Sequence, residues 1–403
     1  MPAPGPPSNP PHVLMLVLND MTHDSRVRRE ADALADAGFR VVVIGTHDAS
    51  SPLPDREAIR GWELRRFRYG RGSERLRHFR VPGPLRHIWQ LIALVRALKK
   101  HHPQAWHAHD FPALVPVALA RLGRRAPNAL VYDVHDLYFH RSTTSVTPWH
   151  ALARRTGLWL ERRLARRADA RLTVSPLMAD FLAALWDISP PPTVVLNGAA
   201  YPPDAPALAR PTGARLWLVH TGTLIARGRK LPEVLAGLVR LPPDVHLTCL
   251  GDGPQQVELV RLAAALGLAA RVHFLPPVPP EHVSAAIRHA DAAVVAFDAS
   301  LPNYAVTIPN KLFEALGAGL PVVAARTPAL ERFFAAHPIG PLWDAADPAS
   351  LAEAVAALAD PAQSSAWRQA ARTAQAQAGW RAQARILCDC YQTFMPLEQT
   401  HAS

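Results

Sequence analysis

The chain has 403 residues, of which 49% are hydrophobic and 19% are charged, and its formal net charge is +11. This length exceeds what one hydrophobic core usually serves and this composition is typical of a folded protein, so a disordered chain is excluded and two domains are expected. No apolar run reaches the roughly 18 residues of a membrane-spanning helix, so no segment is expected to cross a bilayer.

The N-terminal segment and the cysteines bear on where the protein works. Residues 1–11 are rich in proline and are expected to form a disordered tail, because they have neither the basic nor the apolar segment of a signal peptide. Three cysteines suit a reducing compartment. Cys388 and Cys390 are too closely spaced, with no second pair, to indicate a zinc site. We therefore expect a cytoplasmic protein.

Strand and helix patterns alternate through the first half of the chain. Residues 12–18 (HVLMLVL) are typical of a buried parallel strand, residues 25–37 of an amphipathic helix, and residues 40–44 of a second strand. This β-α-β order implies a right-handed crossover and predicts a Rossmann-like domain over residues 12–198. Further strands are expected at 105–108, 129–133, 171–174 and 194–196, with helices after Phe111 and around 149–168.

A second series of the same kind follows a segment rich in Pro and Ala. Residues 199–214 are interpreted as an interdomain linker and residues 215–385 as a second Rossmann-like domain. The predicted fold class is therefore α/β, with two Rossmann-like domains facing a cleft. Residues 386–403 are assigned to the end of a last helix and a tail. The expected elements are strands at 216–220, 245–250, 272–274, 292–296 and 321–325, and helices from 231, before 266, after 309 and over about 365–393, the last folding back across the linker.

One window of the first half carries nearly all of the net charge. Residues 56–100 hold 13 Lys and Arg against 3 Glu, a balance of +10. Within this window, residues 85–100 (LRHIWQLIALVRALKK) have apolar residues at helical spacing among basic ones, so this helix is suited to an anionic membrane surface. The alternative is a core-facing helix with a solvated basic face. No nucleic-acid-binding module accompanies the charge, so no nucleic acid partner is expected.

Two histidine motifs end predicted strands of the first domain. His135 follows the strand at 129–133, at the end where open α/β sheets bind ligands, so it is expected to face the cleft; the alternative is a structural hydrogen-bonding role. His107 and His109 end the preceding strand. Residues i and i+2 of a strand point the same way and no third, distant ligand is evident, so no metal site is predicted.

A basic loop and a glycine turn of the second domain suit a diphosphate. Residues 222–230 (GTLIARGRK) bring three cations after a strand, and such cations neutralise the developing charge of a diphosphate leaving group. The alternative is a solvated basic loop. Gly251 and Gly253 form a turn after the next strand, and glycine there permits a positive φ and a close approach of the backbone.

The start of the helix after residue 308 is the strongest candidate site. Pro309 fits the first turn of a helix, whose free N–H groups and dipole form an anion site suited to a diphosphate. Glu314 lies about 1.5 turns further along, where it is placed to accept hydrogen bonds from ribose hydroxyls. The alternative is an ordinary loop–helix–strand unit with a solvated Glu.

The stretch PNKLFEALGAGLPVVA resembles the donor-binding signature of GT-B glycosyltransferases of the large retaining family 4, and the likeness runs from Asn19 to about Phe334. It implies that Glu314 grips the ribose of an NDP-sugar and that His135 contacts the donor sugar near the reacting carbon. The catalytic residues implied are His135, Arg229 and Lys230. On the acceptor side they are Asp24, Arg26, His109 and Asp110, and the donor-binding residues implied are Gly222, Thr223, Arg227, Gly251, Gly253, Val278, Pro309, Asn310, Lys311, Leu312 and Glu314.

Two positions depart from the family pattern. Thr223 stands where an Arg usually follows the Gly, and Val306 stands where the first Glu of an E-x7-E pair usually binds sugar hydroxyls. A charged acceptor of that kind is typically worth about 1.5–3 kcal/mol. Asp298, Asn303 or Tyr304 is a candidate for a substitute contact.

The resemblance implies glycosyl transfer with retention from an NDP-sugar of the UDP or GDP type, without a metal or another cofactor. The sequence places no pair of carboxylates about 5 Å apart, as a retaining hydrolase needs. A front-face reaction is therefore expected, in which the leaving diphosphate takes the acceptor proton. We expect a lipid-linked or saccharide acceptor, a role in cell-surface polysaccharide or glycolipid synthesis, and peripheral attachment to the inner face of the plasma membrane. The alternatives are a UDP-sugar 2-epimerase and a catalytically impaired nucleotide-sugar-binding protein.

Overall fold

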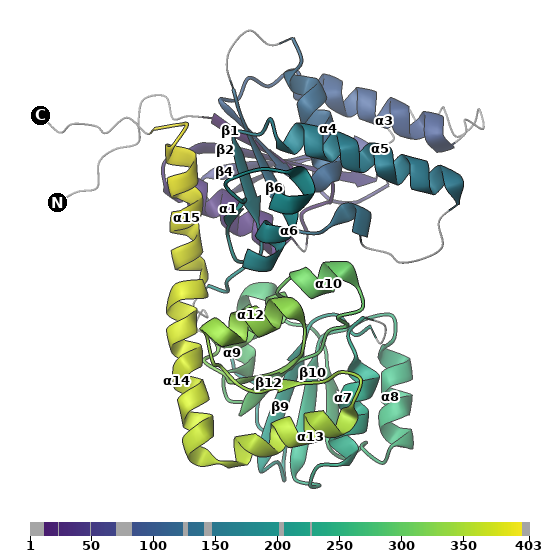
Figure 1. Cartoon of the computed structure of the whole chain (residues 1–403), viewed down its shortest axis with the longest axis vertical. Helices are drawn as coiled ribbons and strands as arrows, with labels where there is room; N and C mark the ends of the chain where they lie inside the picture. The colour runs from purple at the N-terminus through teal and green to yellow at the C-terminus, as the bar shows by residue number, and fades with distance from the viewer. Residues whose placement is uncertain are drawn as a thin grey trace, which may run out of the picture.

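Two α/β domains are stacked along the long axis of the molecule, with a long pair of helices running down one side (Figure 1). The computed structural model describes residues 12–22, 24–48, 50–69, 83–123, 128–140, 147–200, 205–225 and 228–396. The predicted tail at 1–11 lies outside these ranges. Each domain is built on a mostly or wholly parallel sheet, so the prediction of two Rossmann-like domains is confirmed.

An eight-stranded sheet forms the centre of the N-terminal domain, in the order β3-β4-β2-β1-β5-β6-β7-β8. All neighbours are parallel except β3 and β4. The central strands are buried on both faces, which explains their nearly continuous apolar runs. The strands are β1 (His12–Leu16), β2 (Arg40–Asp48), β3 (Arg56–Ile59), β4 (Trp62–Tyr69), β5 (Ala105–His109), β6 (Ala129–Val134), β7 (Ala170–Thr173) and β8 (Thr193–Val194).

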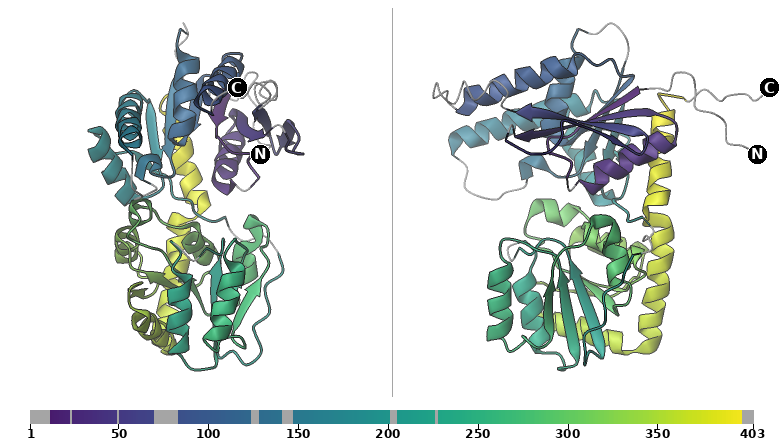
Figure 2. Two further views of the ribbon diagram at one scale, coloured as in Figure 1. Left: turned by 90° about the vertical axis from the view of Figure 1, so that its right-hand side faces the viewer. Right: turned by 180° about the vertical axis from the view of Figure 1, so that it is seen from behind.

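Helices cover both faces of this sheet (Figure 2). α1 begins at Ser25 because the side chain of Asp24 accepts the N–H of Val27, and it packs on one face through Val27 and Leu34. Four helices pack on the other face around a second apolar cluster. The helices are α1 (Ser25–Asp36), α3 (Gly83–Leu98), α4 (Asp110–Arg121), α5 (Pro148–Ala165) and α6 (Pro176–Trp186), with a 3-10 turn at Tyr138–His140.

The C-terminal domain has a six-stranded parallel sheet in the order β11-β10-β9-β12-β13-β14. The strand order reverses between β9 and β12, and in the N-terminal domain it reverses between β1 and β5; ligands of open α/β sheets bind beyond the strand ends at such points. The strands are β9 (Leu216–Thr221), β10 (Val245–Leu250), β11 (Val272–Leu275), β12 (Ala292–Val295), β13 (Val322–Ala325) and β14 (Leu342–Trp343). The helices are α7 (Leu231–Val239), α8 (Gln256–Ala265), α9 (Val283–Ile287), α10 (Pro302–Val306), α11 (Asn310–Gly317), α12 (Pro328–Ala336) and α13 (Pro348–Ala356), with 3-10 turns at Pro280–His282 and Ala357–Ala359.

Two helices connect the C-terminal domain back to the N-terminal one. The prediction of a single helix over 365–393 is wrong, because α14 (Pro361–Ala378) and α15 (Trp380–Gln392) are separated at Gly379. α15 packs against α1, and its Leu387 and Tyr391 are wholly buried in the apolar cluster of the N-terminal domain. The predicted boundary at residue 385 therefore cuts through a helix that belongs to the N-terminal domain.

The basic window at 56–100 contains more structure than its charge indicates. Residues 56–69 form the antiparallel pair β3 and β4, which the sequence analysis did not identify, and Trp62 and Leu64 of β4 are buried. Residues 70–82 lie outside the described ranges. One face of α3 packs into the domain through Leu94 and Leu98. Within the described part of the chain, every helix falls short of the length and apolar character that crossing a membrane requires.

Candidate active site

A pocket of about 660 Å³ lies between the two domains and receives side chains from both. Its position matches the topology, since residues after β1 and β6 form one wall and residues after β9 and β12 form the other. We call it the interdomain pocket. Its lining is Asn19, Asp20, Asp24, Ser25, Arg26, His135, Asp136, Val174 and Asn197 from the first half of the chain, and Thr221, Gly222, Thr223, Arg229, Phe297, Asn303, Tyr304, Thr307, Ile308, Pro309, Asn310, Lys311 and Glu314 from the second.

The start of α11 points its backbone at this pocket. Pro309 is extended and occupies the N-cap, one position before the first helical turn in which the sequence analysis placed it. Asn310 and Lys311 follow, and the first N–H groups of a helix have no intrahelical partner. With the helix dipole they make a site suited to an anion on the C-terminal wall.

Glu314 lies on the same helix, half-buried in the pocket wall. Thr221, the last residue of β9, donates a 2.6 Å hydrogen bond from Oγ1 to Glu314 Oε2. Burial raises the pKa of Glu314, while the Thr221 hydrogen bond and the charges of Lys311, Arg29 and Arg229 oppose the rise. The carboxylate is thus oriented by β9 and surrounded by cations.

Lys311 is a buried side chain of the pocket wall. Its Nζ lies 3.0 Å from His220 Nε2. His220 Nδ1 lies 3.0 Å from the carbonyl of Val294 and must donate to it, so Nε2 is the acceptor for Lys311. Burial lowers the pKa of Lys311 well below its usual value, and the charge of Arg229 acts in the same direction. An anion placed against α11 would relieve this cost.

The basic loop contributes one cation to the pocket wall. Arg229 lines the pocket with its guanidinium 5.1 Å from the centre of the Phe297 ring, and its buried Nε has no hydrogen bond with the described residues. Lys230 instead pairs with Glu233 at 3.1 Å and with Asp298 at 3.8 Å, and it is not among the lining residues. Arg227 lies outside the described residues.

Glycines hold the loop after β9 in place. Gly222 (φ +96°) and Thr223 line the pocket. Gly251 and Gly253 lie behind them: a Cβ on Gly251 would meet the carbonyl oxygen of Gly222 at 2.2 Å, and one on Gly253 would meet that of Leu224 at 2.5 Å. The two glycines permit this close approach, but they do not line the pocket. The predicted donor-binding residues Val278 and Leu312 do not line it either: Leu312 lies in the apolar core, and Val278 packs against that core.

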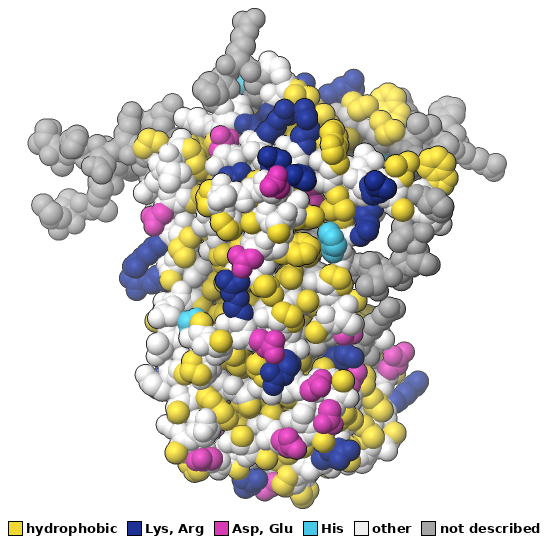
Figure 3. Space-filling model, in the orientation of Figure 1, with side chains coloured by type: hydrophobic (Ala, Val, Ile, Leu, Met, Phe, Trp, Pro, Cys, Tyr) yellow, Lys and Arg dark blue, Asp and Glu magenta, His cyan; other side chains and the backbone are white. Residues whose placement is uncertain are grey.

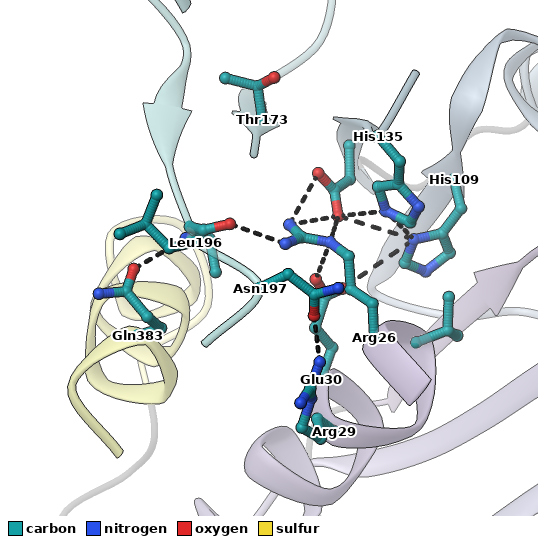
Figure 4. Close-up of polar contacts among 12 residues, drawn as sticks. Arg26, Arg29, Glu30, His109, His135, Thr173, Leu196, Asn197 and Gln383 are labelled. Carbon is teal, nitrogen blue, oxygen red and sulfur yellow. Dashed lines mark hydrogen bonds and ion pairs between the residues drawn. The ribbon is translucent and has the colours of Figure 1, made fainter. Parts of the chain in front are cut away.

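His135 faces the pocket from the N-terminal wall and is held by buried carboxylates (Figure 4). Its Nε2 lies 2.8 Å from Asp133 Oδ2, and its backbone N–H donates to Asp110 Oδ1 at 2.9 Å. Burial lowers the pKa of His135, but the charges of Asp133 and Asp110 outweigh burial and raise the pKa to about 9. The ring is therefore positively charged at neutral pH.

Two of the four predicted acceptor-side residues line the interdomain pocket, and the other two lie behind His135. Asp24 and Arg26 are among the lining residues, and Asp24 also caps α1. Arg26 is 4% exposed, and it donates to both oxygens of Asp133 and to the carbonyl of Val195. His109 and Asp110 lie behind His135 and do not line the pocket.

Four buried side chains bring together atoms of the kind that bind metals. Glu30, His107, His109 and Asp133 offer ligand atoms that all lie within 4.8 Å of one another. The expectation that no further metal-binding side chain lies near His107 and His109 is therefore wrong, because α1 supplies Glu30 and β6 supplies Asp133. Arg26 already places a positive charge on both carboxylates, with its Nε 2.8 Å from Glu30 Oε1. The absence of a metal stays a prediction.

Contacts between the domains involve Arg29 and Asn197, which were not predicted as site residues, and Asn303, which was a candidate for a substitute contact. Asn197 accepts a short hydrogen bond from Arg29, and its Nδ2 donates to Asn310 Oδ1 at 2.6 Å. On the other side of the pocket, Asn303 bonds to the loop after His135. Val306 packs against the apolar cluster of the N-terminal domain and does not line the pocket. Only the Asn197-Gly198 turn after a predicted strand could have marked the first of these contacts.

Both halves of the chain match known family models. Residues 23–198 match a model described as a glycosyl transferase 4-like domain, and residues 218–360 match one described as glycosyl transferases group 1. Among curated proteins, the chain is 31% identical over 282 residues to a GDP-mannose-dependent alpha-(1-6)-phosphatidylinositol monomannoside mannosyltransferase of Mycolicibacterium smegmatis, covering 65% of this chain and 70% of that protein. It is 30% identical over 219 residues to a D-inositol 3-phosphate glycosyltransferase of Corynebacterium diphtheriae, covering 50% of each. The match thus spans about half the length of the first such relatives.

Solved structures share the fold over nearly the whole chain. Sucrose-phosphate synthase from Thermosynechococcus elongatus superposes with a TM-score of 0.72 at 20% identity, covering 95% of this chain and 98% of that one. The Anabaena protein HepE, in complex with UDP-glucose, superposes with a TM-score of 0.67 at 17% identity, covering 95% and 99%. At these identities the likeness establishes the architecture of two facing domains.

Proposed function

This chain belongs to the GT-B glycosyltransferases that join a glycosyl transferase 4-like domain to a group 1 domain, and on that basis we propose that it transfers a sugar from a nucleoside diphosphate sugar to an acceptor with retention of configuration. The observation that carries the proposal is the C-terminal wall of the interdomain pocket. There the N-terminus of α11, Arg229 and the oriented carboxylate of Glu314 lie together, opposite His135. The first two suit a diphosphate and the third suits ribose hydroxyls.

The proposed reaction needs no protein nucleophile. The bond between the anomeric carbon and the phosphate oxygen breaks, and the acceptor oxygen forms its bond on the same face of the sugar. The acceptor proton passes to the departing phosphate oxygen. α11 and Arg229 stabilise the negative charge that develops on the diphosphate, which is the largest contribution a preorganised site makes to such a reaction. We propose that no metal or other cofactor takes part.

The donor is of the UDP or GDP type in this proposal. One relative is named as GDP-mannose-dependent, and a structural neighbour holds UDP-glucose. The test is a panel of UDP- and GDP-sugars in EDTA, followed by thermal unfolding and by product analysis with saccharide and lipid-linked acceptors. A ligand at about 100 Kd adds about 2.7 kcal/mol to stability. Stabilisation by a nucleotide sugar, together with a glycoside product that keeps the anomeric configuration of the donor, supports the proposal. Interconversion of nucleotide sugars at C2 would indicate an epimerase. Binding of a nucleotide sugar without turnover would indicate a catalytically impaired protein.

We propose a lipid-linked acceptor at an anionic, cytoplasmic membrane surface, in the synthesis of a cell-surface glycolipid or polysaccharide. The support is an exposed surface where α4 lies beside both α3 and α5, with hydrophobic and basic side chains together (Figure 3). From the sequence, this surface was expected within residues 56–100, but α5 contributes more of it. Its exposed apolar residues are Ile88, Trp89, Ile92, Leu119, Leu122, Trp149, Leu152 and Trp159. The exposed basic residues of the same helices and their ends are Arg96, Lys99, Lys100, Arg154, Arg155, Arg162, Arg163 and Arg166.

A surface that exposes tryptophans beside arginines is suited to contact with the headgroup region of a bilayer. Trp149 is 79% exposed and Trp159 is 60% exposed, on a helix that also carries a row of arginines. Tryptophan and leucine insert at the boundary between headgroups and acyl chains, and each basic residue near an anionic surface adds about 1 kcal/mol. Membrane attachment there would bring a lipid-borne acceptor to the N-terminal domain.

A further inference from the structure

A row of three side chains connects the two domains by hydrogen bonds and ends at the first residue of α11. Arg29 of α1 donates through Nη2 to Oδ1 of Asn197, which lies three residues after β8 (Figure 4). Nδ2 of Asn197 donates in turn to Oδ1 of Asn310 at 2.6 Å. Asn197 is 9% exposed, whereas Asn310 is exposed in the wall of the interdomain pocket. The row therefore leads from the N-terminal domain to the wall where we place the diphosphate.

The donors and acceptors of these three side chains have one consistent arrangement. A guanidinium carries only N–H groups and can only donate, so Asn197 must turn its amide oxygen towards Arg29. The amide nitrogen of Asn197 then faces Asn310 and needs an acceptor there, which is Oδ1. The Nδ2 group of Asn310 is left over, and it makes no hydrogen bond with any described residue. Asn310 thus offers a side-chain donor at the pocket wall.

Neighbouring contacts hold Arg29 and Asn197 in this arrangement. The backbone N–H of Leu196, the residue before Asn197, donates to Oε1 of Gln383 of α15 at 2.8 Å. The guanidinium of Arg29 lies 5.4 Å from the centre of the Trp380 ring. Its Nε is buried without a hydrogen-bond partner among the described residues. A reversal of the Asn197 amide would put an N–H group against this buried cation, so the amide has little freedom to turn over.

We propose that Arg29 and Asn197 are positioning residues that fix the amide of Asn310, so that its Nδ2 group donates to the diphosphate of the bound donor. This inference rests on the proposed function and deepens it, because it adds a side-chain donor beside the free N–H groups of α11. Hydrogen bonds to charged oxygens are stronger than those between neutral groups. A reversed Asn310 amide would turn its oxygen towards the phosphates and repel them. The contact is made to phosphate, so it is the same for UDP and GDP.

Two variants of the full-length protein separate the direction of the hydrogen bonds from packing. Asn310→Ala removes the proposed donor, so the Kd of UDP and GDP in titration calorimetry should rise roughly tenfold or more. Asn197→Asp has nearly the same shape and gains an ion pair with Arg29, so thermal stability should be kept. Its carboxylate can only accept, however, so Asn310 must turn its Nδ2 group towards it and its oxygen towards the phosphates. The Kd should again rise roughly tenfold or more.

The matched control is Asn128→Asp, because Oδ1 of Asn128 also accepts from an arginine, Arg121, away from the pocket. Its nucleotide Kd should stay within about twofold of the wild type. A new charge at residue 197 could also act on the phosphates through space, and a double-mutant cycle separates the two effects. In the Asn310→Ala background, Asn197→Asp should raise the Kd less than about threefold. A tenfold rise in that background would overturn the inference, because charge and not the Asn310 amide would be responsible.

Pyrophosphate is the third probe, since it carries the phosphates without a base or a sugar. An affinity for the bound probe that is unchanged in Asn310→Ala or in Asn197→Asp overturns the inference and leaves the proposed function standing. Asn310→Ala alters an exposed side chain, so it decides the matter even where Asn197→Asp does not fold. Binding of pyrophosphate without binding of either nucleotide refutes the proposed function, and the pyrophosphate affinities of the variants still decide the inference. If the wild-type protein binds none of the three probes, both are wrong.

Discussion

Asn303 of α10 bonds across the interdomain pocket to Asp136, with Nδ2 donating to Oδ1 at 2.7 Å. The Asn303 Oδ1 accepts the backbone N–H of Leu137 at 2.8 Å, so one side chain of the C-terminal domain fixes the loop that follows His135. The side chain is 7% exposed. Val306 lies on the same short helix and packs against the apolar cluster of the N-terminal domain, so this helix serves domain contact at the position where the family resemblance implies a sugar-binding Glu.

We expect Asn303→Ala to loosen the closed arrangement of the two domains. The change leaves a backbone N–H and a carboxylate in the interface without this partner, at a cost of about 1–3 kcal/mol. The value of kcat/KM for the donor should fall about tenfold, while thermal unfolding of each domain changes little. Asn128→Ala, which removes a partner of Arg121 away from the pocket, is the matched control. Equal activities of the two variants would show that the Asn303 bridge does not matter for turnover.

The second prediction concerns Glu314. Hydrogen bonds to a charged acceptor are worth about 1.5–3 kcal/mol, so Glu314→Ala should weaken binding of UDP or GDP by roughly 10- to 150-fold. Titration calorimetry with both nucleotides measures the loss. Glu331→Ala removes an exposed carboxylate of α12 that pairs with Arg326 and should have no effect. Unaltered nucleotide affinity in Glu314→Ala would remove the ribose contact from the proposed site.

Replacing Arg229 should lower kcat much more than replacing Lys230. Arg229 lines the pocket, so Arg229→Ala should lower kcat by about 10²-fold through loss of charge stabilisation. Lys230 already pairs with Glu233 and Asp298, so Lys230→Ala should change kcat less than fivefold. Steady-state kinetics with the active donor compares them. The reverse order would assign the diphosphate contact to Lys230, which the sequence indicated together with Arg229.

Glu161 of α5 provides a prediction about stability and pH. It is buried, and the hydroxyl of Tyr132 donates to its Oε1 at 2.7 Å. Burial raises the pKa of Glu161 from 4.5 to about 7. Because the folded protein then binds more protons than the unfolded chain between pH 4.5 and 7, this group stabilises the fold below pH 4.5, and that contribution is lost as the pH rises towards 7.

Glu161→Gln should therefore be more stable than the wild type at pH 8, by about 2 kcal/mol, and nearly equal to it at pH 4.5. The amide oxygen of Gln can still accept from Tyr132. Urea unfolding at the two pH values measures the difference. The same offset at both values would mean that a change in packing, and not ionisation, is responsible.

The surface on α3, α4 and α5 leads to a flotation experiment. Wild-type protein should float with vesicles that contain anionic lipid at low salt, and less at 0.5 M salt because surface charges are screened. Trp149→Ala together with Trp159→Ala should reduce flotation at least fivefold. Val257→Ala, an exposed apolar residue of α8 that is 62% accessible, is the control. Failure of the wild-type protein to float at any salt concentration would refute attachment to the membrane.

Sequence patterns predicted most of the buried strands because the central strands are apolar on both faces. They also predicted the candidate donor wall, since the start of α11, Arg229 and Glu314 lie within short motifs. They missed β4 because one of its three buried positions is an arginine: Trp62, Leu64 and Arg66 face inward, and Arg66 donates to the carbonyl of Asp20.

The support of His135 was not predictable in the same way. Glu30, His107 and Asp133 come from separate elements up to about a hundred residues apart, and no local spacing brings them together. The break at Gly379 was missed because helical periodicity continues on both sides of it. Its backbone carbon lies 2.7 Å from where a Cβ on Gly198 would be, so only the fold shows that these two glycines pack together.

The packing of α15 has a consequence for synthesis on the ribosome. Tyr391 closes the apolar cluster beside α1, and its hydroxyl lies 2.8 Å from Nδ1 of the buried His107. The last strand of the N-terminal domain, β8, is translated about 185 residues before α15. At about 5–20 residues per second, the helix that completes this domain is therefore synthesised roughly 10–40 s after the strand. During that interval the apolar residues of the N-terminal domain that α15 later covers are exposed to solvent. A chaperone could bind the growing chain at this surface.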